Sequence, residues 1–203
     1  MQNAFKNYHK RDQVKILIVL RKPCCNLDKI VQAIGNCGKY THCELYCPEM
    51  LYNGKVGWTF TNFSFYNMQA TQNSLKQYRN QSHLFDVHEI FITSTEHIKL
   101  LRWNLDLIYH NCSYNYSDLM LHLLPNFVAS AMRPDNKDKL FAPTKLYCAQ
   151  AVILALQHAL GPEHKISRSL AEINIHLCKP SSINQQLSLI LGAPKNMNQF
   201  VVL

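Results

Sequence analysis

The sequence predicts an α+β fold in which an antiparallel sheet or small barrel packs against helices, with a cysteine at the start of a central helix. Residues 14–21, "VKILIVLR", form a short aliphatic run typical of a buried strand. Asn53-Gly54 is the dipeptide of a two-residue hairpin turn. Residues 148–160, "CAQAVILALQHAL", are apolar nearly all round, as in a helix buried in a core. Hairpins joined to such a helix indicate a sheet with a helical layer.

The length of 203 residues suits one domain spanning 1–203, with 1–13 and 195–203 expected to be peripheral. Hydrophobic residues make up 47% of the chain, as in a soluble globular protein, and no apolar run reaches the roughly 20 residues of a membrane-spanning helix. The N-terminal run "KILIVL" is too short for a secretory signal. We therefore expect a cytoplasmic protein that is not secreted, with its eight cysteines reduced.

The chain is basic, with 21 Lys and Arg against 13 Asp and Glu and a net charge of +8. This charge would suit an anionic membrane surface or another polyanion. The basic residues are scattered singly or in pairs rather than in one block, which argues against a nucleic-acid tract. A merely solvated basic surface is the simpler interpretation, and a basic nucleic-acid-binding or zinc-dependent protein remains an alternative.

In the first half, a helix over 27–35 is expected, capped by Asn26 and ended by Gly35. The strand "YTHCELYC" follows, and Pro48 should end it or force a bulge. A return strand, "KVGWTFTNFSF", completes the hairpin, and "HEIFITS" at 88–94 is a further strand.

In the second half, the spacing of Thr93 and Glu96 predicts a capping box. The helix after it should bury an apolar face made of Ile98, Leu101, Leu105 and Ile108. Residues 115–132 are expected to be helical with a break at Pro125, and 132–144 to be a loop. The last helix, "KPSSINQQLSLILG", should be capped at Ser181 or Ser182, with a loose tail after it.

The strand "THCELYC" carries polar residues in a pattern that favours catalysis over metal binding. Alternation puts His42, Glu44 and Tyr46 on one face and Cys43, Leu45 and Cys47 on the other. A zinc site would need ligands from both faces, and the spacings lack the short pairs of structural zinc sites. A carboxylate two residues from a histidine can instead orient a general base. The alternative is a histidine that is simply satisfied within the sheet.

Cys148 begins the central helix, where free amides and a partial positive charge stabilise a thiolate. The same amides can receive the oxyanion that develops when a thiolate attacks a carbonyl. Buried free cysteines are often only small hydrophobic residues, and this is our interpretation of Cys112 and Cys178.

Two motifs resemble a known family. "YTHCELY" is similar to the S/T-H-x-E strand, and "LYCAQAVILAL" to the Y-C-S helix start, of the circularly permuted papain-like, NlpC-like cysteine hydrolases. This group includes the bacterial YiiX and YycO types, lecithin:retinol acyltransferase and a poxvirus member. The histidine strand precedes the cysteine helix here, which is the permuted order, and the likeness covers residues 14 to about 190.

The resemblance implies roles for particular residues. Cys148 would be the nucleophile, His42 the general base and Glu44 the third residue of the site.

In other members the orienting group lies on the next strand. A two-residue turn at Asn53-Gly54 would bring Thr61 or Phe63 level with Tyr46 or Glu44, whereas a bulge at Pro48 would bring Asn62 or Ser64 onto that face. Thr61 and Asn62 are therefore alternative orienting residues.

Tyr147 and Tyr116 would line the oxyanion or substrate pocket, and core packing is the simpler role for Tyr147. Ala149 departs from the small hydroxyl residue of many relatives.

The function expected from this resemblance is a cysteine hydrolase, a peptidase, amidase or thioesterase-like enzyme that forms an acyl-enzyme without metal or organic cofactor. Its substrate would be a protein, a peptide or an acyl-lipid. The alternatives are a lipid acyltransferase or phospholipase of the lecithin:retinol acyltransferase type, and an inactive binding module of the same fold. Because viruses with large genomes carry members of the group, a viral source would place the protein in host cytoplasm.

Overall fold

The structure is a computed structural model that describes residues 13–34, 38–48, 57–61, 68–73, 75–122, 124, 126–132 and 145–201. Among these residues, six strands form one antiparallel sheet in the order β4-β3-β2-β1-β5-β8. The strands are β1 (Val14–Arg21), β2 (His42–Pro48), β3 (Gly57–Thr61), β4 (Gln69–Asn73), β5 (Phe85–Ile92) and β8 (Lys195–Asn196). The α+β prediction is confirmed at this level.

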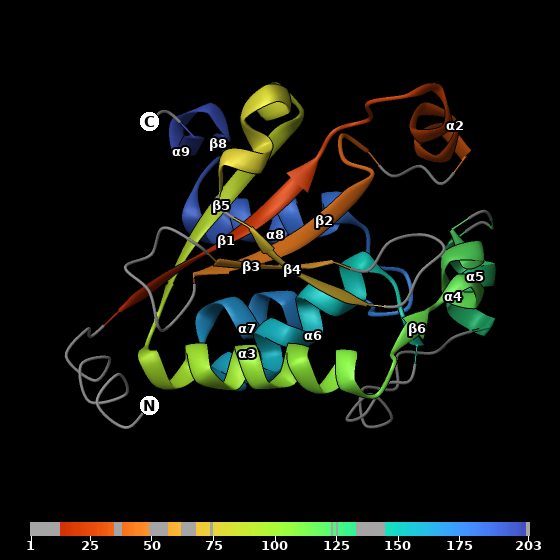
Figure 1. Cartoon of the computed structure of the whole chain (residues 1–203). Coiled ribbons are helices and arrows are strands. Elements are labelled where there is room, and N and C mark those ends of the chain that lie inside the picture. Colours follow the sequence, from red (N-terminus) through yellow and green to blue (C-terminus); the bar gives the residue numbers. More distant parts are fainter. Residues whose placement is uncertain are drawn as a thin grey trace.

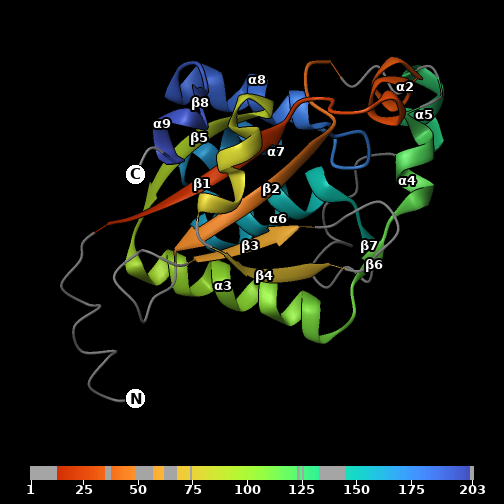
Figure 2. The same ribbon diagram turned by 45° about the horizontal axis from the view of Figure 1, so that its top comes forward.

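Helices cover both faces of the sheet (Figures 1 and 2). Buried side chains of α3 (Ser94–Tyr109), α6 (Cys148–Leu160), α7 (Lys165–Ala171) and α8 (Pro180–Leu191) form the larger core cluster with one face. On the other face, the 3-10 helix η1 (Leu75–Leu84) and α9 (Asn198–Val201) pack over Leu17, Val19 and Val87. β1 is central and its Ile16, Ile18 and Leu20 are fully buried, as an aliphatic strand covered on both faces requires.

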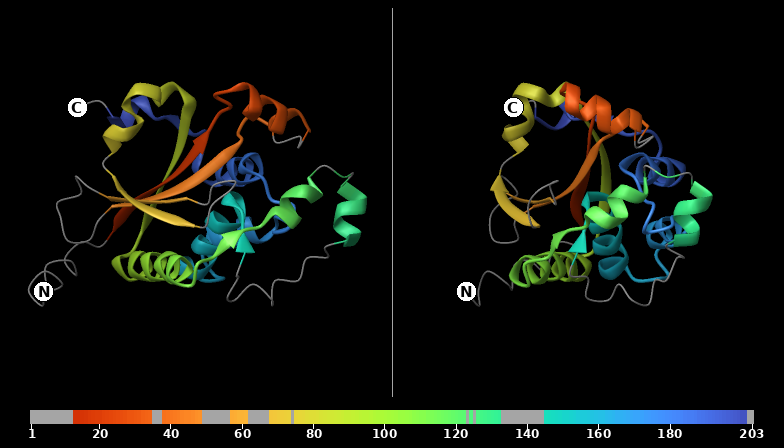
Figure 3. Two further views of the ribbon diagram at one scale, coloured as in Figure 1. Left: turned by 45° about the vertical axis from the view of Figure 1, so that its right-hand side comes forward. Right: turned by 90° about the vertical axis from the view of Figure 1, so that its right-hand side faces the viewer.

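The remaining elements lie on one side of the molecule (Figures 1 and 2). They are α2 (Asn26–Ile34), α4 (Tyr116–Leu121), α5 (Asn126–Met132) and a two-stranded parallel ladder of β6 (Ser113–Tyr114) with β7 (Lys145–Leu146). Figure 3 shows α4 and α5 standing away from the sheet on this side of the molecule. Among the described residues, no helix is both long and apolar enough to cross a bilayer.

Several predicted boundaries agree with the structure. β1 and α6 have the predicted bounds, and Gly161 ends α6 with a φ of 74°, a left-handed conformation that glycine adopts without strain. Thr93 and Glu96 form the predicted capping box at the start of α3. Two short helices, α4 and α5, replace the helical region predicted over 115–132. Gly35, Asn53-Gly54 and Pro125 lie outside the described residues.

Other predictions need correction. α2 begins at Asn26 itself, β5 begins at Phe85 rather than His88, and Lys179 rather than a serine caps α8, where Pro180 takes the first helical position. β4, η1 and α7 were not predicted. Their segments are polar and lack a clear hydrophobic period, the signal from which elements are recognised.

The buried face of α3 also differs from the prediction. Ile98 and Leu105 are exposed, and the helix instead buries Leu100, Trp103 and Leu107 against α6. Asn104 is buried with this face because its amide donates to the Leu100 carbonyl of its own helix at 2.8 Å. A polar group whose hydrogen bond is satisfied can be buried at little cost in free energy. Asn104 therefore does not prevent the helix from burying the face that carries Leu100, Trp103 and Leu107.

The C-terminal segment is not a loose tail in its described part. β8 pairs with β5, and Met197 is fully buried beside Leu17 and Val19. The tail therefore completes the second face of the sheet, where Met197 and Phe200 pack with Leu17, Val19 and Val87.

Candidate functional site

Cys148 lies at the beginning of α6, which packs its apolar surface on the sheet and on α3. Ala149, Ile153 and Leu156 are all buried around it, so the helix axis is fixed within the core. This arrangement directs the helix N-terminus, with its free amides and partial positive charge, at the start of β2. The Cys148 side chain is buried, with 6% of its surface exposed.

His42 is the first residue of β2, and its imidazole shares a hydrogen bond with the Cys148 thiol. The ring is buried, with 7% exposed. Burial by itself favours the neutral ring, but the nearby Cys148 sulfur and Glu44 carboxylate outweigh it and raise the pKa of His42 above 6.5. The structure thus brings together the two residues that were expected to carry the chemistry.

The pKa of Cys148 lies well below its ordinary value of 9.0. The largest cause is a hydrogen bond from the Cys43 thiol, followed by burial, which acts in the opposite direction. The positive charge and hydrogen bond of His42 and a hydrogen bond from the Cys43 backbone also favour the thiolate. The site can therefore hold a thiolate beside an imidazolium, the resting state of an activated thiol nucleophile.

The face of β2 that packs on α6 is the cysteine face. Cys43, Leu45 and Cys47 belong to the core cluster that contains α6, whereas Tyr46 belongs to the cluster on the opposite side. His42 reaches Cys148 although the helix lies on the other face, because it is the terminal residue of the strand. The alternation was predicted correctly, but Cys43 as a neighbour of Cys148 was not.

Glu44 is buried on the second face and its Oε1 accepts a hydrogen bond from the Tyr78 hydroxyl at 2.6 Å. Its negative charge acts on the His42 ring and favours the imidazolium. Burial raises the pKa of Glu44 above 4.5, against the lowering effects of His42 and Tyr78. Tyr78 belongs to η1, which sequence reasoning did not predict, so this contact could not have been anticipated.

The pairing of β2 with β3 differs from both predicted registers. Leu45 pairs with Phe60 and Tyr46 with Thr59, so the ladder begins at Pro48 with Gly57. More residues separate the strands than a two-residue turn contains, and β3 is shifted by two positions relative to the register expected from Asn53-Gly54. Thr61 is the last residue of β3, and Asn62 lies outside the described residues.

The Tyr147 hydroxyl lies among polar partners from the segment before α8 and from His122. The hydroxyl donates to the Cys178 carbonyl at 2.7 Å, and His122 Nε2 lies 3.3 Å from the same oxygen. Its ring is fully buried, so the packing role weighed for this residue describes its side chain. Tyr116 begins α4 and is 43% exposed, and its ring lies 4.9 Å from that of Tyr114 at an interplanar angle of 54°.

A buried polar network anchors the N-terminus of α6, and sequence reasoning missed it. Gln150 accepts from the Tyr147 backbone amide at 3.1 Å and donates to Asp118 at 2.8 Å. Asp118 also bonds His176 Nδ1 at 2.7 Å, and Asn115 donates to Gln150 at 3.3 Å. Three segments distant in sequence, 115–118, 147–150 and His176, meet here, and no local pattern could reveal it.

A narrow crevice, too small to hold a water molecule, lies beside Cys148 between the helix and the sheet. Its walls are largely apolar and comprise Cys43, Leu45, Phe60, Met68 and Val152, with Asn104 as the polar exception. The surroundings of the candidate nucleophile on this side are therefore mostly apolar.

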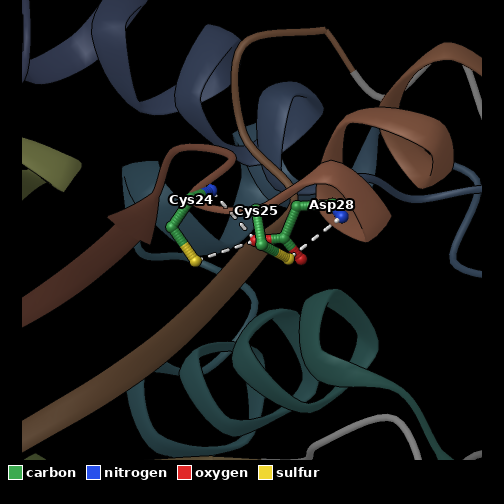
Figure 4. A group of neighbouring side chains, drawn as sticks. All are labelled: Cys24, Cys25 and Asp28. Carbon is green, nitrogen blue, oxygen red and sulfur yellow. Dashed lines mark hydrogen bonds between the residues drawn. The ribbon is translucent and has the colours of Figure 1, made fainter.

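Cys24, Cys25 and Asp28 lie together at the start of α2 and offer three potential metal-ligand atoms within 4.8 Å of one another (Figure 4). In the described part of the chain, no other group of three or more His, Cys, Asp or Glu side chains lies close enough to share a metal ion. The Asp28 carboxylate accepts from the backbone and thiol of Cys24 at 3.0 and 3.1 Å, and Arg21 pairs with it at 3.4 Å. Structural zinc sites use four ligands, and a guanidinium beside the carboxylate opposes cation binding. The group is better described as a hydrogen-bonded turn that leads into α2.

No family model matches the chain, and no curated protein or solved structure was found with significant similarity to it.

Proposed function

We propose that this protein is a cysteine-dependent hydrolase that acts on an amide, ester or thioester of a protein, a peptide or an acyl-lipid. The observation that carries the proposal is the hydrogen bond between Cys148, at the N-terminus of a buried helix, and His42, at the start of a neighbouring strand. The raised pKa of His42 and the lowered pKa of Cys148 support the same assignment, because they are the shifts of a thiolate–imidazolium pair.

In the proposed mechanism the Cys148 thiolate attacks the substrate carbonyl, and free amides at the start of α6 receive the oxyanion. The His42 imidazolium then gives its proton to the leaving amine, alcohol or thiol, and the acyl-enzyme remains. Neutral His42 next takes a proton from water, whose oxygen attacks the thioester carbonyl. The carboxylic acid leaves, and the thiolate–imidazolium pair is restored.

We further propose a circularly permuted papain-like core, built from β2, its partner strands and α6. The order of the strand that carries His42 before the helix that carries Cys148 supports it, as does the packing of that helix on an antiparallel sheet. A nucleophilic thiol must stay reduced to work, so we propose a reducing, cytoplasmic location.

The test is to trap the acyl-enzyme. The protein would be incubated with a panel of activated acyl esters, acyl thioesters and peptide amides, and the mass of each cysteine-containing peptide measured. We expect an adduct at Cys148 in the wild-type protein and none in Cys148→Ala. His42→Ala should form the adduct at least about tenfold more slowly, because the imidazolium that stabilises the thiolate and protonates the leaving group is lost. The exposed thiols would be removed in a Cys24→Ser/Cys25→Ser background, which should leave the adduct unchanged.

The outcome separates the alternatives. Release of the acyl group to water identifies a hydrolase, and release only to an added alcohol or amine identifies an acyltransferase. An adduct that forms equally in His42→Ala, or not at all with any member of the panel, would contradict the proposal and favour a binding module. Iodoacetamide gives a second readout: Cys148 should react faster at neutral pH than Cys112, whose pKa burial raises to about 11.

A further inference from the structure

Cys43 is the residue of the sheet that meets Cys148 most directly. It follows His42 in β2, is 1% exposed, and belongs to the strand face on which α6 packs. Both thiols line the crevice between helix and sheet. The Cys43 thiol and the Cys43 backbone are each hydrogen-bonded to the Cys148 sulfur, so one residue supplies two contacts to the same atom.

The two thiols are not equivalent, because their surroundings favour charge on only one of them. Cys148 has the N-terminus of a 13-residue helix behind it and the His42 ring beside it. Cys43 lies in the middle of a sheet, where burial and the neighbouring sulfur raise the pKa of its thiol well above 9.0. The pair therefore shares one negative charge, with the charge on Cys148 and the proton on Cys43.

We infer that Cys43 is a positioning residue for the nucleophile: its thiol and its backbone amide hold the Cys148 sulfur beside His42 and replace the water that a buried thiolate would otherwise need. A buried anion is stable only when fixed donors compensate for its lost hydration. The inference rests on the proposed function, since it assigns a role within the same site.

Other titratable groups also act on the Cys148 sulfur, and a substitution at Cys43 removes none of them. Those that interact electrostatically with it come from β2, the residue after α4, the residue before α6 and the segment before α8: His42, Glu44, His122, Tyr147 and Cys178. An effect of a Cys43 substitution on Cys148 can therefore be compared with the effect of a substitution elsewhere on the same strand.

Cys47 provides the matched control. It lies on the same strand and the same face, is fully buried, and has its pKa raised by burial alone. Cys47→Ala should therefore remove as much buried volume as Cys43→Ala without removing a hydrogen bond to Cys148.

The experiment measures the rate of Cys148 alkylation by iodoacetamide as a function of pH, with each cysteine followed separately by peptide mass spectrometry. In Cys43→Ala the acid limb of this alkylation profile should move to higher pH by about one unit, because the Cys148 thiolate loses the Cys43 thiol as a hydrogen-bond donor. At a given pH on that limb, Cys148 should then be alkylated roughly tenfold more slowly. Cys43→Val, which fills a similar space without a donor, should behave alike. Cys43→Ser should restore most of the wild-type profile, and Cys47→Ala should leave the midpoint unchanged. Thermal unfolding of each variant would confirm that it is folded.

An unchanged acid limb in both Cys43→Ala and Cys43→Val, or an equal shift in Cys47→Ala, would overturn the inference. These results differ from a failure of the proposed function. If wild-type Cys148 reacts no faster than Cys112 at neutral pH, both are wrong, whereas a fast wild-type reaction with no effect at Cys43 removes the positioning role alone.

Discussion

At the scale of single residues, the site depends on three charges close together on β1 and β2: the buried His42 and Glu44 and the half-buried Arg21. Glu44 stabilises the charged form of His42, and Arg21, which pairs with His42 across the strands, opposes it. The Tyr78 hydroxyl holds the Glu44 carboxylate in place on the side of the sheet away from α6. Glu44 therefore acts on the histidine mainly through its charge, and the carboxylate need not touch Cys148.

The first prediction at this scale concerns Glu44→Gln. The loss of the negative charge should lower the pKa of His42, so the imidazolium is lost at a lower pH. Proton donation to the leaving group needs that imidazolium, and the alkaline limb of the pH–activity profile should therefore move to lower pH. Tyr78→Phe keeps the carboxylate and removes only its hydrogen bond, and it should shift the limb less. An alkaline limb that does not move in Glu44→Gln would exclude an electrostatic role for Glu44.

At the scale of elements, α6 carries the nucleophile and is fixed at both ends. Gly161 ends the helix, and at its start Gln150 links the Tyr147 backbone to Asp118 in α4. The Asp118 carboxylate is shared with His176, which lies between α7 and α8. A small rotation of this first turn would move the Cys148 sulfur away from the His42 ring. It would also change the position of the sulfur relative to the free amides, whose partial charge acts only within the first turn.

The second prediction concerns Gln150→Leu, which keeps the apolar volume and removes the amide. The Tyr147 amide and the Asp118 carboxylate lose a partner in a buried place, so the free energy of unfolding should fall by about 1–3 kcal/mol. Urea denaturation measures this change. Gln157→Leu, on the same helix but half-buried, should change the free energy by about 0.5 kcal/mol or less. Equal effects of the two substitutions would show that the network does not hold the helix start.

At the scale of the whole molecule, the helical layer on the α6 side encloses groups that must stay uncharged. His97 lies on the buried face of α3, is 0% exposed, and burial lowers its pKa to about 4. An unfolded chain has a histidine pKa near 6.5, so between pH 6.5 and 4 the unfolded state binds a proton that the folded state does not. Stability must therefore fall as the pH falls through this range.

The third prediction is the size and origin of this slope. One such histidine should contribute up to about 1.4 kcal/mol per pH unit to the loss of stability, as measured by urea denaturation at a series of pH values. His97→Gln should reduce the slope, even if it lowers stability at all pH values. His110→Gln, exposed just after α3, should leave the slope unchanged. His122, whose pKa burial also lowers to about 4, should leave part of the slope in place. A slope as steep in His97→Gln as in the wild type would assign the acid sensitivity to groups other than His97.

The sequence by itself determined the elements whose signals are local. The aliphatic run of β1, the capping box at Thr93 and the apolar helix that starts at Cys148 each depend on neighbouring residues, and the structure has them where they were expected. It also identified His42 and Cys148 as the pair to test. Glycine and capping residues act on the chain next to them, which is why such features can be read from sequence.

Only the tertiary structure decided which residues surround that pair. Cys43 rather than Glu44 faces the helix, Gln150 and Asp118 fix its first turn, and the C-terminal segment around Met197 closes the second face of the sheet. These contacts join strands and helices far apart in the chain. Their formation depends on how α6 is rotated on the sheet and on the register of β2 with β3, and side-chain packing sets both in three dimensions.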